Sequence, residues 1–177
     1  MSSLFKNIVR FALFILVQAF VLNKIPALHE FIKPYVYFLF ILWLPFNISR
    51  GFLLIVAFTF GLVMGYFSDN PGLYAAPCVL IAFLRPYLLS ILLPQEATEA
   101  SYAEPSFKSM GLAPYAVYVI ILTFVHHAFL VLIEWMSFGN FIFFIGKVAG
   151  STAISLLLIF ITEMLFSRKA KYRTNAA

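Results

Sequence analysis

Charged side chains are scarce in this sequence. They make up 11% of its 177 residues, whereas 63% of the residues are hydrophobic and 19% are aromatic. Soluble domains are roughly a quarter charged and close to half apolar. The composition therefore excludes an ordinary soluble domain and is typical of a protein that lies in a membrane.

Cysteine is almost absent. The single cysteine, Cys78, lies inside an apolar run, so an intrachain disulfide is excluded and a reactive thiol is not expected. The sequence also has no cluster of cysteine and histidine with the spacing of metal ligands. We therefore expect no metal site and no cofactor.

Motifs of familiar enzyme classes are missing as well. There is no Gly-x-Ser-x-Gly elbow with a histidine and an acid downstream, no phosphate-binding loop and no HExxH helix. The carboxylates Glu96 and Glu99 lie in the polar stretch 94–111, where we expect water to solvate them. We therefore predict that the protein is not an enzyme. Nucleic-acid binding is not indicated either, because the basic tail offers too few cations.

Long apolar runs make up most of the chain. They are continuous, unlike the alternating strands of about ten residues in a membrane barrel, so the backbone must be satisfied within helices. We predict an all-α polytopic membrane protein with one transmembrane domain, 1–167, and a basic cytoplasmic tail, 168–177. Runs of about twenty residues can span a bilayer, and the sequence contains six candidates: 7–24, 34–48, 50–68, 73–93, 112–136 and 140–166.

Two of these candidates need comment. The run 7–24 lacks a small-x-small cleavage site at its end, so we interpret it as a retained helix and not as a secretory signal. The run 34–48 is bounded by Pro34 and Pro45, which leaves about a dozen residues free to be helical, too few for a full span. We expect this second transmembrane segment to be short, and to be tilted, broken or buried among its neighbours.

The distribution of lysine and arginine predicts the topology. The two sides are very unequal: Lys6, Arg10, Arg50, Lys108, Arg168, Lys169, Lys171 and Arg173 on one, and Lys24 and Lys33, together with Asp69, on the other. Since cytoplasmic loops carry the excess of positive charge, both termini are expected in the cytoplasm. The net charge of +5 is thus a topology and lipid-surface signal.

Ionisable residues within apolar runs are costly and face protein or water. Arg85 lies near the expected middle of the fourth span and is followed by Pro86, which lacks an amide donor and so leaves the carbonyl of Ala82 free. Two interpretations stay open. Arg85 either forms a ligand or partner site, or it braces the bundle by bonding loosened carbonyls or a buried glutamate, with Glu134 as the first candidate.

The fifth span carries His127 and Glu134 on one face, while the neighbouring His126 points about 100° away. A proton relay and a metal site are both conceivable, but a metal needs at least about three converging ligands. We favour structural hydrogen bonding between helices.

Small residues form two ridges that let another helix approach closely. Gly61 and Gly65 form one in the third span. The other, in the sixth span, consists of Gly146 and Gly150 beside Lys147, Ser151 and Ser155. Both ridges indicate helix packing, either internal or with a partner. Lys147 is expected to extend toward the membrane surface, and Glu163 toward Arg168 or water.

Several stretches together resemble the MreD family of rod-shape-determining membrane proteins, in its Bacteroidetes-type branch. They are "PYVYFLFILWLPF" at 34–46, "GLVMGYFSDNPGLYAAPCVLIAFLRPYLL" at 61–89, "PQE" after the fourth span, and "VHHAFLVLIEWMSFGNF" at 125–141. Two positions depart from the family pattern: Gly65 stands where an aspartate is common, and Tyr74 where a histidine is frequent. Asp69 lies one turn further on and could replace the aspartate if the helix continues that far.

The resemblance implies a non-catalytic subunit of the cell-elongation complex in the bacterial inner membrane. It also implies specific partners: the scaffold MreC, the glycosyltransferase RodA, a class B transpeptidase, and the filament protein MreB at the cytoplasmic face. The family is similar in architecture to the substrate-binding subunits of vitamin uptake transporters. A small-molecule-binding subunit of an uptake transporter is therefore the alternative.

Overall fold

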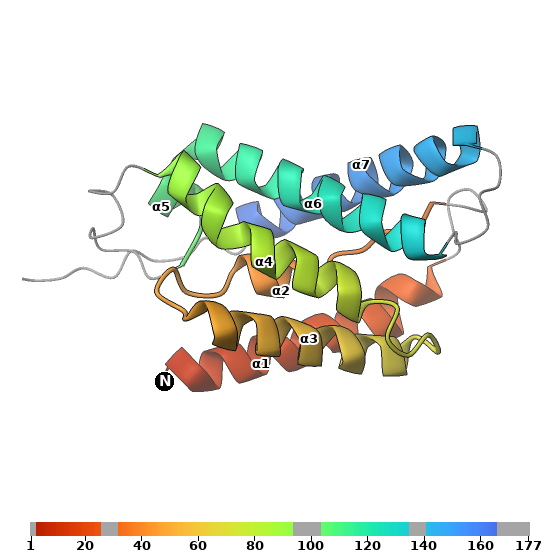
Figure 1. The fold of residues 1–177 in the computed structure, drawn as a ribbon, viewed down its shortest axis with the longest axis horizontal. Helices are drawn as coiled ribbons and strands as arrows, with labels where there is room; N and C mark the ends of the chain where they lie inside the picture. Colours follow the sequence, from red (N-terminus) through yellow and green to blue (C-terminus); the bar gives the residue numbers. More distant parts are fainter. Residues whose placement is uncertain (1–2, 26–31, 94–103, 135–140, 166–177) are drawn as a thin grey trace, which may run out of the picture.

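The computed structural model describes residues 3–25, 32–93, 104–134 and 141–165. Within these ranges the chain is helical and contains no strand (Figure 1). The elements in chain order are α1 Ser3–Leu16, the π-helical turn η1 Val17–Val21, the 3-10 turn η2 Leu22–Lys24, α2 Leu39–Leu42, α3 Arg50–Phe67, α4 Ala75–Leu92, α5 Phe107–Met110, α6 Leu112–Glu134 and α7 Phe141–Leu165.

Five helices in the described part are long and apolar enough to cross a membrane. The first of them, Phe5–Lys24, combines α1 with η1 and η2, and the others are α3, α4, α6 and α7. These helices coincide with five of the six predicted spans. The predicted all-α fold and the multi-pass membrane character are thus confirmed.

The second predicted span is not a membrane-spanning helix. Between residues 32 and 48 the only helix is α2, which has four residues. Pro34 and Pro45, near the two ends of this segment, lack amide donors and disfavour a helical conformation of the residue before each of them. The predicted count of six transmembrane helices is therefore not confirmed.

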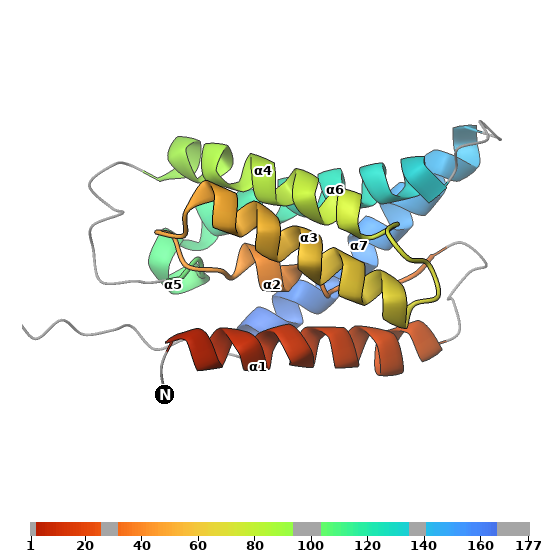
Figure 2. The same cartoon turned by 60° about the horizontal axis from the view of Figure 1, so that its bottom comes forward.

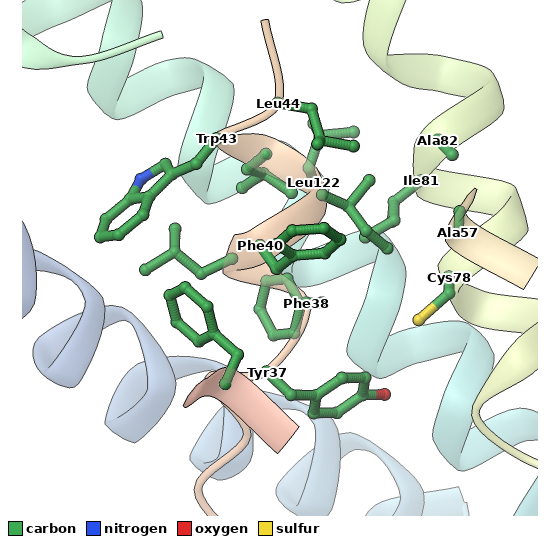
Figure 3. Close-up of a cluster of buried hydrophobic side chains, with 14 of the residues drawn as sticks. Tyr37, Phe38, Phe40, Trp43, Leu44, Ala57, Cys78, Ile81, Ala82 and Leu122 are labelled. Atoms are coloured by element: carbon green, nitrogen blue, oxygen red, sulfur yellow. The ribbon is translucent and has the colours of Figure 1, made fainter. Parts of the chain in front are cut away.

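The segment 32–48 nevertheless runs lengthwise through the bundle. Figures 1 and 2 show it entering at the end where η2 and α3 finish and leaving at the end where α3 begins. Every residue from Tyr35 to Leu44 is buried. Figure 3 shows Tyr37, Phe38 and Phe40 between the surrounding helices, on the same level as Cys78 and Ile81 of α4. The centre of the core is thus the segment 32–48, which is non-helical except for the four residues of α2.

Aromatic packing fixes this segment in place. Phe40 lies with its ring centroid 4.7 Å from that of Phe60 on α3 and 5.5 Å from that of Phe11 on α1. On the other side, Phe38 stacks on His126 of α6 at 4.3 Å between centroids. Such ring pairs add about 0.5–1.5 kcal/mol each beyond the area that they bury.

The start of α1 and the start of α3 lie at the same end of the bundle as α5 (Figure 2). Ion pairs join α1 to the segment that precedes α5, because Arg10 and Lys6 on α1 contact Glu104 with N–O distances of 2.8 and 3.4 Å. Most of the predicted polar stretch 94–111 and the basic tail 168–177 lie outside the described residues, and so do Glu96 and Glu99.

Candidate functional site

The buried segment 32–48 satisfies part of its backbone itself: the turns around α2 include bonds from the Ile41 nitrogen to the Phe38 carbonyl at 2.9 Å and from the Trp43 nitrogen to the Leu39 carbonyl at 3.0 Å. The N–H and C=O groups outside these turns need other partners, because each unsatisfied group in hydrocarbon costs several kcal/mol. In this protein, polar side chains from four surrounding elements bond the backbone of the segment. We call this set the cradle; it consists of Gln18, Arg85, Tyr118, Ser151 and Ser155.

Gln18 on η1 bonds the beginning of the segment. Its side-chain oxygen accepts from the backbone nitrogens of Val36 at 2.9 Å and Tyr37 at 3.3 Å. Its nitrogen donates to the carbonyl of Pro34 at 3.0 Å. Gln18 is not among the residues predicted from the sequence, although an amide side chain inside the first apolar run was an available signal.

The serines of α7 bond the same stretch from the opposite side. Ser155 accepts from the backbone nitrogen of Tyr35 at 2.9 Å, and Ser151 from that of Lys33 at 3.4 Å. Gly150, one residue before Ser151, lies against Ile32, since a methyl group added there would be 2.7 Å from the Ile32 Cδ1 atom. The predicted ridge at Gly150 and Ser151 thus packs internally, against the non-helical segment.

Arg85 on α4 bonds the end of the segment. Its Nη2 donates to the carbonyls of Leu44 and, at 3.3 Å, Pro45, and its Nε donates to the Tyr118 hydroxyl at 3.0 Å. Tyr118 in turn donates to the carbonyl of Leu42 at 3.0 Å. Arg85 has 1% of its surface exposed. These contacts agree with the interpretation that Arg85 braces the bundle. Its partners are backbone carbonyls and the Tyr118 hydroxyl, and not a glutamate.

One detail of the Arg85 hypothesis was wrong. Glu134 does not contact Arg85, because it forms an ion pair with Lys147 at 2.8 Å. Arg85 lies within α4, Ala75–Leu92, and its acceptor Pro45 immediately precedes the exposed turn that leads into α3. The proline after Arg85 lies within α4, where the helix continues past it.

His127 and Glu134 share one face of α6 but take different partners. The Nδ1 atom of His127 donates to the Thr123 carbonyl at 2.8 Å, so a neutral ring has Nε2 as its acceptor. The Ser155 hydroxyl, 3.1 Å from that Nε2, then donates to it and keeps its lone pairs for the Tyr35 amide. His127 therefore orients Ser155 within the cradle.

The neighbouring histidine has a different contact. His126 Nε2 lies 2.7 Å from the Tyr37 hydroxyl, inside the core. Among the residues that the structure describes, no group of three or more His, Cys, Asp or Glu side chains could hold a metal ion. Both histidines thus bond other buried groups across helices, as the structural interpretation predicts.

A separate buried chain of hydrogen bonds reaches Glu163 on α7. Trp43 Nε1 donates to the Tyr115 hydroxyl at 3.0 Å, and Tyr115 donates to the Glu163 carboxylate at 3.0 Å. The segment 32–48 is thereby connected to α7 near the helix end. The predicted partner Arg168 lies outside the described residues.

The remaining predicted glycines have distinct surroundings. A methyl group at Gly61 would lie 2.5 Å from Ala75 Cα, and one at Gly65 would lie 2.7 Å from the Asn70 carbonyl oxygen. The Gly61 ridge therefore serves the close approach of α3 and α4 and of the turn between them. Gly146 is open, because a methyl group there would meet nothing within 4 Å.

Asp69 does not replace the family's aspartate on the third span. The helix α3 ends at Phe67, and Asp69 lies beyond it in an exposed turn with φ 55°. The condition that the helix continues to Asp69 is therefore not met.

Comparisons with protein-family models, with curated proteins and with solved structures found no match.

Proposed function

We propose that this chain is a non-catalytic subunit of the bacterial cell-elongation complex, similar to MreD, that works by contact between membrane helices. One structural observation supports this most directly: residues Tyr35–Leu44 fill the bundle axis and are themselves buried. The polar groups of the cradle are bonded to the protein's own backbone. The surface on which such a protein acts is then its outer face.

The alternative, a small-molecule-binding transporter subunit, is less well supported. Such a subunit needs a roomy interior cavity in which a few polar groups converge on the ligand. Here the aromatic rings of Tyr37, Phe38 and Phe40 occupy the space between the helices (Figure 3). A ligand could enter that space only if the segment 32–48 moved out of its cradle.

The outer face of α7 is the surface that we assign to a partner helix. Gly146, Ala149 and Ala153 are exposed on it, while Ser151 and Ser155 of the same helix face inward. Small side chains let a second helix approach closely, which is how helices associate in lipid. In this proposal the partners are MreC, RodA and the class B transpeptidase, with MreB at the cytoplasmic face.

The proposed topology has six crossings of the inner membrane. Five are helices, and the sixth is the non-helical segment 32–48 inside the bundle. Both termini are then cytoplasmic, and the cradle is the device that lets a non-helical crossing exist at all.

Gly146→Leu tests the partner face, because Gly146 is exposed and a methyl group added there meets nothing within 4 Å. The matched control is Gly51→Leu on α3, where an added methyl group also meets nothing within 4 Å. We expect MreC or a wall synthase to co-purify from native membranes with the parent and the control, and to be lost with Gly146→Leu. The proposal fails if no wall protein co-purifies with the parent and a small molecule is found in stoichiometric amount instead.

A further inference from the structure

We infer that a cleft between α3 and α4 binds the phosphoryl headgroup of an anionic lipid. The cleft has a volume of about 200 Å³ and lies where the segment 32–48 ends and α3 begins. Its lining includes two guanidinium groups, those of Arg50 and Arg85. This inference goes beyond the proposed helix contacts and does not depend on them.

The deeper cation, Arg85, keeps a free donor. Its Nε and Nη2 bond protein oxygens, whereas its Nη1 has no hydrogen-bond acceptor among the described residues. A guanidinium that is 1% exposed and that lines a cleft with an unused N–H pair is a fixed anion-binding group. The carbonyls that hold Arg85 also fix its direction.

The outer cation, Arg50, is held from a different side. It is exposed at the first position of α3, and its guanidinium carbon lies 5.2 Å from the centre of the Tyr87 ring. The amino end of α3 adds partial positive charge at the same place. Among the described residues, neither Arg50 nor Arg85 has a carboxylate within salt-bridge distance, so the positive charge of the cleft is not balanced there.

The walls of the cleft indicate a lipid and not a free ion. They include Phe46, Leu53, Leu89 and Leu93, which offer hydrocarbon surface beside the two cations. A phosphoryl group joined to an acyl or prenyl chain satisfies both parts of such a lining.

The position of the cleft along the bundle is the one expected for a site that binds a lipid headgroup. Residues 45–49 form a turn that includes the exposed Asn47 and Ser49. An exposed polar turn belongs at the membrane surface, because hydrocarbon cannot solvate its backbone. Arg50 follows this turn directly, and Arg85 bonds the carbonyl of Pro45 just before it. The phosphate of a lipid in the adjoining leaflet can therefore reach both guanidinium groups.

The test uses the full-length protein in detergent and measures binding by native mass spectrometry. The probes are dioctanoyl phosphatidic acid, dioctanoylglycerol, which lacks the phosphate, and inorganic phosphate. The main variant is Arg50→Gln, which leaves the Arg85 brace intact. Ser90→Glu is a second variant, since Ser90 is exposed on the lining of the cleft and a carboxylate there would oppose an anion. Lys108→Gln, an exposed cation on α5, is the control for the loss of one charge.

We expect the parent and Lys108→Gln to bind one phosphatidic acid with equal affinity, and both cleft variants to bind it at least about tenfold more weakly. Dioctanoylglycerol should not compete, and inorganic phosphate should bind far more weakly than the lipid. The inference is overturned if Arg50→Gln binds like the parent, or if Lys108→Gln loses as much affinity. It is also overturned if dioctanoylglycerol or inorganic phosphate binds as tightly as phosphatidic acid.

Discussion

The guanidinium of Arg85 donates to the carbonyl oxygen of Leu44, a residue 41 positions earlier in the chain. Leu44 lies at the end of the buried segment, and among the described residues no backbone N–H donates to its carbonyl. Arg85 on α4 thus supplies the N–H donors for the carbonyls of Leu44 and Pro45, which lie between α2 and α3. This explains why a costly side chain is placed in an apolar helix: the alternative is a buried carbonyl with no donor.

Arg85→Ala should lower the free energy of unfolding by about 3 kcal/mol or more, because several oxygens lose their donor and each such group costs about 1–3 kcal/mol. Arg85→Lys should recover only part of this loss, since an ammonium cannot reach Tyr118 and the carbonyls with one planar fork. The measurement is the thermal unfolding midpoint in detergent. Arg50→Ala, at an exposed position, is the control and should shift it little. A midpoint for Arg85→Ala equal to that of the parent would refute the brace.

Gln18→Met should destabilise the protein by about 2–3 kcal/mol, because two buried amides and one carbonyl of the segment lose their partner. Methionine has a similar size, so the effect of lost volume is small. The neighbouring change Phe20→Leu, on the exposed face, should leave the unfolding midpoint near that of the parent. Equal midpoints for Gln18→Met and Phe20→Leu would show that Gln18 is dispensable.

Gly61 and Gly146 should respond in opposite directions to alanine. The methyl group of Gly61→Ala would lie 2.5 Å from a backbone atom of α4, so α3 and α4 must separate and the unfolding midpoint should fall. Gly146→Ala meets open space and should stabilise α7 by up to about 1 kcal/mol through helix propensity. Thermal unfolding of the two variants side by side checks this, and a fall for both would mean that Gly146 is also packed.

The five long helices could be predicted from sequence because hydrophobic length alone determines them in a membrane. The segment 32–48 could be predicted only to be short, from Pro34 and Pro45. Its path through the bundle depends on Gln18, Ser155 and Arg85, which come from three distant elements. No local pattern relates these residues to the backbone groups that they bond.

For the candidate site, too, some features could be predicted from the sequence and others could not. The cost of a buried charge was enough to predict that Arg85 has a partner. It was not enough to choose between a carbonyl and Glu134, because that carboxylate pairs with Lys147 on the next helix at 2.8 Å. Likewise, Gly146 and Gly150 are equivalent in sequence, but only Gly150 faces the segment inside the bundle.

The location of the two termini distinguishes a crossing segment from one that does not cross. Five helices alone would place the ends of the chain on opposite sides of the membrane, whereas a sixth, non-helical crossing at 32–48 returns them to the same side. The ion pair of Arg10 with Glu104 supports the second case, because it joins the first helix to the segment before α5 at one end of the bundle. Reporter fusions at Ser101 and at the C-terminus should therefore both report cytoplasm, and a reporter inserted after Asn70, in the turn between α3 and α4, should report the opposite side. A C-terminal reporter outside the cytoplasm, with Ser101 inside, would mean an odd number of crossings in the second half of the chain, and the proposed topology would have to be abandoned.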